Sequence, residues 1–351
     1  MIPTIKFIAF SILMGVLFSA CMHSTVLNVV RPADIDIPSE IVTFSVVQRH
    51  EAPKGKRFKK NWEGMVSGER IGLDLRSANF SSTGLILELS KSPRFSIKQV
   101  IMNEKLYGTG TVTMAEPLSW EEVEKICVAN NTEALIVIEA FDSDINKNIT
   151  PKEVTRTING VRVTEKVYES DIRAKVFIGW RIYYPNEKRI LDVYNDQITQ
   201  RGNTSWRTEL DANNDQSRVE GLVQQGAQNL GVQYARRISP TRVTLTRYFY
   251  GKGSFGLKQA KKSMLSKNYD DAIDLWESEF HSTLKQKVKS RSAFNLAVGY
   301  EAKGDYETAV NWAKESMFAG NKKAKVYLNK LQGRLKDEER LKRQMNHNDK
   351  D

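Results

Sequence analysis

The fold that we expect for this chain is decided by the stretch ALIVIEAF, residues 134–141. It is an apolar run with a single Glu, and it predicts a strand. A strand without polar alternation is typical of a central position in a sheet, where both faces are covered. The stretch therefore predicts a layered domain built around this strand.

The residues before this run predict two more strands with a helix between them. IVTFSVV, residues 41–47, and FSIKQVIM, residues 95–102, have the apolar character of strands. The helix should end near Leu89, since Ser92-Pro93 follows it. HEAPKGKRFKKNW, residues 50–62, predicts a basic loop, which is either solvated or in contact with lipid phosphates.

A second helix is marked by its start. Ser119 and Glu122 form a capping box, which predicts a helix that runs to about Asn130. Cys127 lies on its apolar face. We interpret Cys127 as a small buried hydrophobic residue rather than a reactive thiol.

The residues after the central run predict an antiparallel meander. Asn159-Gly160 is a strong signal for a two-residue hairpin. Residues 161–169 and 175–184 alternate as strands, and a second turn leads to a strand at residues 190–198. A row of apolar residues on the middle strand is expected to face the core: Val176, Ile178, Trp180 and Ile182.

An amphipathic helix, residues 217–238, completes the first domain, and VTLTRYFY then returns as an extended segment. The order of strands and helices predicts a mixed-sheet α/β sandwich over residues 34–250. With the helical region that follows, the fold class is α+β.

The C-terminal region carries an internal repeat. NYDDAI, residues 268–273, and DYETAV, residues 305–310, begin 37 residues apart and share a Tyr and an Ala in register. They resemble the tetratricopeptide repeat, a helical hairpin of roughly 34 residues. The extra residues imply an insertion, which we place in KVKSR. Residues 251–345 are therefore expected to form helical hairpins, followed by a polar tail at 346–351.

Two hairpins are few for a stable stack, because each buries its apolar face on a neighbour. The pair is expected to dock on the α/β domain, to bind a protein partner, or to do both. Four aromatic residues are the candidate anchors for a partner: Tyr269, Trp276, Tyr306 and Trp312.

The N-terminus has the layout of a secretion signal. Lys6 precedes the apolar run Phe7–Phe18, and small residues follow. As a helix the run spans only about 18 Å, which argues against a retained membrane span. Phe18-Ser19-Ala20-Cys21 resembles the lipobox of bacterial lipoproteins. The resemblance implies a signal peptide at residues 1–20, lipidation of Cys21 and a tether at residues 21–33. An ordinary secretory signal is the alternative.

Two further resemblances concern the whole chain. Pro93-Arg94-Phe95 before a strand, together with ALIVIEAF, resembles the amino-terminal domain of TolB and the curli-secretion lipoproteins. RPADIDIP, SPRF and ISPTRVTLTRYFY resemble an uncharacterised family of Bacteroidota lipoproteins. These likenesses imply an architecture and an outer-membrane location, but they imply no reaction.

One polar segment has the ligand spacing of a calcium loop. Asp142, Asp144, Asn146 and Glu153 stand where an EF-hand loop has oxygen ligands. Lys147 replaces the glycine that such loops need, and a plain loop is the favoured interpretation. We expect no cofactor and no metal, and the sequence offers no catalytic constellation.

Composition fits a globular protein with a basic surface. The 351 residues include 40% hydrophobic and 27% charged residues, with a net charge of +11. We expect a non-enzymatic envelope lipoprotein, held in the outer membrane by acylated Cys21 and facing the periplasm. It would bind the lipid bilayer and an unknown envelope protein, but no nucleic acid. The alternatives are a subunit of a curli-secretion-like assembly and an enzyme that acts on envelope glycans.

Overall fold

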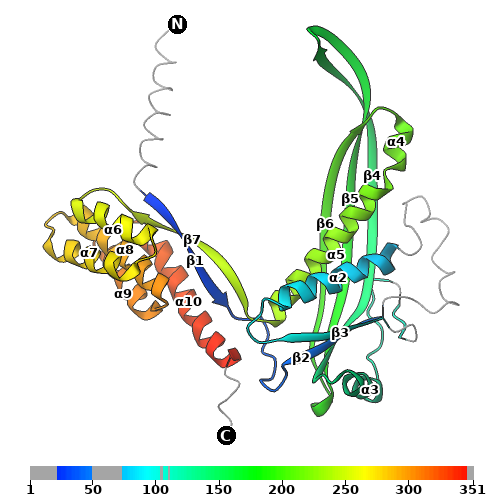
Figure 1. Ribbon diagram of the computed structural model, residues 1–351, viewed down its shortest axis with the longest axis horizontal. Coiled ribbons are helices and arrows are strands. Elements are labelled where there is room, and N and C mark those ends of the chain that lie inside the picture. The colour runs from blue at the N-terminus through cyan, green and yellow to red at the C-terminus, as the bar shows by residue number, and fades with distance from the viewer. Residues whose placement is uncertain (1–21, 50–72, 103–105, 110, 346–351) are drawn as a thin grey trace. The chain divides into compact units, whose positions relative to one another are not determined.

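The computed structural model describes residues 22–49, 73–102, 106–109 and 111–345 (Figure 1). They divide into two units. Residues 33–241 and 344–345 form an α/β unit, and residues 22–32 and 242–343 form a helical unit. The predicted α+β class is confirmed. The proposed lipidation site Cys21, the signal peptide, the basic loop at 50–62 and the tail at 346–351 lie outside the described residues.

The α/β unit is built on a mixed five-stranded sheet with the order β3-β2-β4-β5-β6. Strand β2 pairs in parallel with β3 and β4, and β4, β5 and β6 pair antiparallel in sequence. The predicted central strand is therefore the third of five. The strands are β2 (Thr43–Gln48), β3 (Ser96–Met102), β4 (Ala134–Ile158), β5 (Val161–Tyr184) and β6 (Arg189–Trp206).

Helices cover both faces of this sheet. On one face, α2 (Leu73–Leu89) and α5 (Gln216–Ile238) pack on Ile136 and Ile138 of β4. On the other face, α3 (Trp120–Asn130) packs on Leu135 and Val137. All residues from 134 to 141 are buried, so the prediction of a strand covered on both faces is confirmed. The short helices η4 (Pro185–Glu187) and α4 (Glu209–Asn214) complete the unit.

Local signals predicted several boundaries correctly. The Ser119–Glu122 capping box is present, and α2 ends at Leu89 as expected. Asn159 and Gly160 both have positive φ, 51° and 81°, which a two-residue turn of the type I′ class requires. The row on β5 that includes Trp180 is fully buried. The two strands expected at 161–169 and 175–184 are one continuous strand, β5.

Residues 142–153 form neither the plain loop that we favoured nor a calcium loop. Residues 142–153 lie inside β4 and pair with β5 along their whole length, from Asp142↔Phe177 to Glu153↔Lys166. At about 3.3 Å per residue, Asp142 and Glu153 are separated by roughly 36 Å. Oxygen ligands spread along an extended strand cannot surround one ion. No cluster of metal-ligating side chains occurs among the described residues.

The helical unit begins with a strand where the sequence predicted a tether. Strand β1 (Met22–Arg31) pairs with β7 (Thr241–Tyr250) in a two-stranded sheet. Thr25 and Leu27 are buried while Val26 between them is exposed, the alternation of a half-buried strand. Strand β7 belongs mainly to this unit, so the boundary between the two compact units lies near residue 241.

Five helices follow, and they form the expected hairpins. Asn268 and Asp305 cap the two repeat helices, each accepting a hydrogen bond from the backbone N–H three residues later. Gly304 ends α8 with φ 85°, and KVKSR lies in the first turns of that helix. None of the described helices is long and apolar enough to span a bilayer. The helices are α6 (Phe255–Leu265), α7 (Tyr269–Ser282), α8 (Gln286–Lys303), α9 (Tyr306–Phe318) and α10 (Ala324–Met345).

The backbones of helices α2 and α5 are in direct contact. A β-carbon on Gly231 of α5 would overlap the Ser81 carbonyl oxygen and lie 2.8 Å from the backbone nitrogen of Leu85. A β-carbon on Gly84 of α2 would overlap the Gln228 carbonyl oxygen. The contact therefore requires glycine on both helices.

We expect Gly231→Ala to lower the free energy of unfolding by about 2 kcal/mol, because the two helices must separate to admit the methyl group. Urea denaturation followed by circular dichroism measures this change. Gly221→Ala is the matched control, since Gly221 is exposed on the same helix and has nothing within 4 Å of a β-carbon. Its unfolding free energy should stay unchanged or rise by up to about 1 kcal/mol. Equal effects of the two substitutions would contradict this packing.

Candidate functional site

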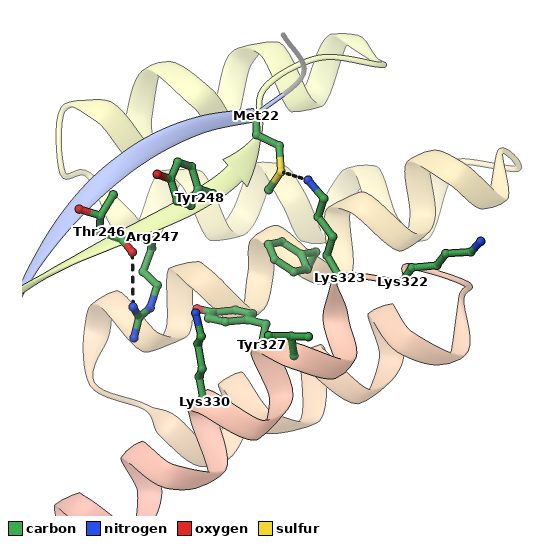
Figure 2. A pocket seen from close by; sticks show the side chains of 10 residues that line it. Met22, Thr246, Arg247, Tyr248, Lys322, Lys323, Tyr327 and Lys330 are labelled. Atoms are coloured by element: carbon green, nitrogen blue, oxygen red, sulfur yellow. Dashed lines mark hydrogen bonds between the residues drawn. The ribbon is translucent and has the colours of Figure 1, made fainter. Parts of the chain in front are cut away.

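A pocket of about 750 Å³ opens on the helical unit (Figure 2). Its walls come from three parts of the chain that are distant in sequence: strand β1, strand β7 and the start of α10, with one residue of α8. Aromatic and basic side chains dominate the lining. The lining residues are Met22, Thr246, Arg247, Tyr248, Phe294, Lys322, Lys323, Val326, Tyr327 and Lys330.

Two lining residues, Arg247 and Tyr327, are held by the buried carboxylate of Glu301. Arg247 donates from Nε and Nη2 to the two carboxylate oxygens of Glu301, both at 2.6 Å. The Tyr327 hydroxyl donates to Glu301 Oε2 at 2.6 Å. Burial and the Glu301 charge raise the pKa of Tyr327 well above its usual value. Since a bidentate pair of this kind neutralises the guanidinium, Arg247 contributes rigidity rather than free positive charge.

The open side of the pocket carries lysines without an acidic partner. In the described part of the chain, Lys322, Lys323 and Lys330 form no ion pair with a carboxylate. Lys323 Nζ donates to Met22 Sδ at 3.0 Å, and a thioether is a weak acceptor that neutralises no charge. Figure 2 shows Lys323 and Lys330 directed toward the strands, while Lys322 points away at the edge.

Two features add to this positive character and to the shape of the pocket. The pocket lies at the N-terminal end of the 22-residue helix α10, where the helix dipole places partial positive charge. Phe294 and Tyr327 are nearly fully buried and form apolar walls, whereas Tyr248 is 58% exposed at the mouth. The pocket is therefore suited to an anionic group attached to an apolar body.

The four aromatic residues expected to anchor a partner are not brought together as one surface. Trp276 is fully buried in the core of the helical unit. Tyr306 is 8% exposed, and its hydroxyl accepts a hydrogen bond from Arg334 Nη2 at 2.9 Å. For these two, the anchor prediction is wrong, because the packing of the hairpins uses them. Trp312 and Tyr269 are half-buried at the edge of that core.

A second polar cluster lies inside the α/β unit. A bulge in β4 between Ile138 and Ala140 places the Glu139 side chain, which has no exposed surface, next to two arginines. Glu139 Oε1 accepts from Arg181 Nη1 at 2.9 Å and from the Tyr183 hydroxyl at 2.6 Å. Glu139 Oε2 lies 3.4 Å from Arg49 Nη1.

This cluster ties the central strands to the chain segment that precedes α3. Arg49 donates to the backbone carbonyls of Tyr107 and Glu116, and Tyr183 accepts from the Leu118 N–H at 3.0 Å. Burial raises the pKa of Tyr183 to about 12, so its hydroxyl remains a donor. Burial also raises the pKa of Glu139, and the Tyr183 hydrogen bond and the two arginine charges counteract it. Because solvent has no access to the carboxylate, the cluster has a structural role.

Cys127 lies beside this region and fits its predicted role. Its thiol is buried against the sheet, and burial raises its pKa to about 11. A thiol with so high a pKa carries almost no thiolate near neutral pH, so it is a poor nucleophile.

We expect Glu139→Leu to lower the free energy of unfolding by about 3 kcal/mol or more, since two arginines lose their buried counterion. Urea denaturation monitored by fluorescence measures the change. The control is Glu165→Leu, which removes the exposed Arg156–Glu165 pair on the same two strands and should cost less than about 1 kcal/mol. A loss at Glu139 no larger than at Glu165 would refute the structural role.

Comparison with known proteins gives two family matches. Residues 258–337 match a domain of unknown function (DUF6340), and residues 41–250 match a second one (DUF8603). No curated protein matches the chain.

Among solved structures, a putative neuraminyllactose-binding hemagglutinin homolog from Helicobacter pylori aligns at 9% identity and a TM-score of 0.23, over 58% of this chain and 89% of that one. PelC from Paraburkholderia phytofirmans aligns in two crystal forms. One, of a point variant, has 10% identity and a TM-score of 0.22 over 61% and 100% of the two chains. The other has 12% identity and a TM-score of 0.19 over 60% and 99%. Likenesses this distant carry no inference. The match over residues 41–250 covers more than half of the sequence, and the chain belongs to the family described as a domain of unknown function (DUF8603).

Proposed function

We propose that this protein is a non-enzymatic, membrane-anchored envelope lipoprotein that acts as a protein-interaction or scaffold module through its α/β domain and helical repeats. The sequence Phe18-Ser19-Ala20-Cys21 after an apolar run supports the anchor. In this proposal, acyl chains on Cys21 hold the protein in the outer membrane, facing the periplasm. A mature lipoprotein carries several chains, which anchor far more firmly than one.

The observation that carries the interaction role is the outer part of the β4–β5 hairpin, residues 152–167, which we name the hairpin arm. Pairing of β5 with β6 begins at Tyr168↔Trp206, so within the arm β4 and β5 pair only with each other. Figure 1 shows this hairpin extending past the other strands of the sheet. A two-stranded ribbon alone is marginally stable in water, so a partner surface would stabilise it.

One face of the hairpin arm ends in apolar side chains. Ile158 pairs with Val161, and Val163 pairs with Arg156, so these residues share a face. Ile158, Val161 and Val163 are 55%, 63% and 42% exposed. The opposite face carries polar pairs such as Thr155 with Thr164. Burying one such aliphatic side chain contributes about 1.5–3 kcal/mol, which favours a protein partner with an apolar surface against this face.

We expect a photo-crosslinking amino acid at position 161 to give a discrete adduct with an envelope protein in living cells, because Val161 has the most exposed side chain of the apolar face. The same amino acid at position 155, on the polar face, is the control and should give far less. Immunoblotting and mass spectrometry detect the adduct.

The adduct should disappear when Ile158 and Val163 are both replaced by Asp, since charges on that face remove the apolar contact. It should persist with Val193→Asp, which changes an equally exposed valine on β6. An adduct that is insensitive to the arm substitutions, or no adduct at position 161, would contradict this role.

We expect Cys21→Ala to move the protein from the membrane fraction to the soluble periplasmic fraction, because the thioether bond to the lipid cannot form. Mass spectrometry of the mature N-terminal peptide should show the acylated cysteine in the unaltered protein. Cys127→Ala, at the other cysteine of the chain, serves as the control and should stay in the membrane fraction. Membrane retention of Cys21→Ala with normal processing would rule out the lipid anchor.

A further inference from the structure

We infer that the pocket lined by Met22 binds the phosphate group of an anionic phospholipid headgroup in the membrane to which the protein is anchored. This inference deepens the proposed function and rests on its membrane location. It adds a second, electrostatic attachment, at residues distinct from the basic loop 50–62.

The first argument is uncompensated charge. Arg247 is neutralised by Glu301, whereas Lys323 and Lys330 face the strands without a carboxylate partner among the described residues. The N-terminal end of α10 strengthens the positive potential in the same place. Lysine is a compact point charge that binds phosphate, and a phosphate group can accept hydrogen bonds from both ammonium groups.

The second argument is position along the chain. Met22 lines the pocket, and the proposed lipid-bearing residue Cys21 precedes it directly. Consecutive Cα atoms are about 3.8 Å apart, so an anchor on Cys21 would tie this mouth of the pocket to the headgroup layer. Tethering raises the effective concentration of neighbouring headgroups, and a weak site would then be occupied.

The third argument is the mixed lining. Thr246 and Tyr248 are polar lining residues, and both are exposed. Phe294 and Tyr327 form the buried apolar walls. A phospholipid presents the same combination, with an anionic phosphodiester and apolar acyl chains. A free inorganic phosphate would leave the apolar walls unused, which favours the lipid as the source of the phosphate.

The test uses full-length protein with Cys21→Ala, so that binding does not depend on acylation. Sedimentation with vesicles of phosphatidylglycerol and phosphatidylcholine measures partitioning, and vesicles of phosphatidylcholine alone give the background. We expect Lys323→Gln with Lys330→Gln to reduce partitioning at least about tenfold, since each lysine near an anionic surface raises partitioning roughly fivefold. The matched control is Lys287→Gln with Lys314→Gln, two exposed lysines on α8 and α9.

Each outcome decides the inference. A loss confined to the pocket variant supports it. Equal losses in both double variants would overturn it, because attraction would then follow net charge alone. No loss in either variant would also overturn it, because the pocket lysines would then contribute nothing to vesicle binding. If the pocket substitutions abolish binding of inorganic phosphate to the Cys21→Ala protein in solution but leave its vesicle partitioning unchanged, the site takes free phosphate and the lipid assignment is wrong. Lipidation itself is tested separately by the mass of the N-terminal peptide, so the two failures are distinguishable.

Discussion

The α/β unit depends on covering both faces of the apolar segment 134–141. Both faces of β4 are apolar over this segment, so α2 and α5 pack on one face and α3 packs on the other. The close approach of α2 and α5 follows from the same demand, since two helices share one face of the sheet. Glu139 interrupts the apolar run, and the bulge at that residue turns its carboxylate toward Arg49 and Arg181.

The candidate functional surfaces lie where this coverage ends. Strand β4 continues beyond its pairing with β2, and with β5 it forms the hairpin arm, in which the two strands pair only with each other. The helical unit has a similar division. Trp276 and Tyr306 are buried in its core, while the lysines at the start of α10 remain exposed to solvent. In each unit, buried residues determine the fold, and the proposed contacts are made by residues that remain exposed at the surface.

Sequence reasoning succeeded where a signal is local. The Asn159-Gly160 turn and the Ser119 cap each depend on a few neighbouring residues. It failed where pairing is distant. Residues 142–153 were interpreted as a plain loop because clusters of Asp and Asn are typical of turns, and only the register with β5 makes them a strand.

The same limit explains the other two misses. Residues 22–31 carry a weak alternating pattern, and their partner β7 lies more than 200 residues away in the sequence, so a tether was the local interpretation. The pocket was missed because its lining comes from Met22, β7 and the start of α10, which are distant in the sequence. The adjacent lysines Lys322 and Lys323 were the local sequence feature that could have indicated a basic site. The central claim is that the hairpin arm is covered by a protein partner in the envelope. Hydrogen exchange tests it most directly, by comparing the protein in isolated outer-membrane vesicles with the purified protein. The account predicts slower exchange at residues 152–167 in the vesicles and equal exchange at residues 134–141, whereas equal rates in the arm would contradict it.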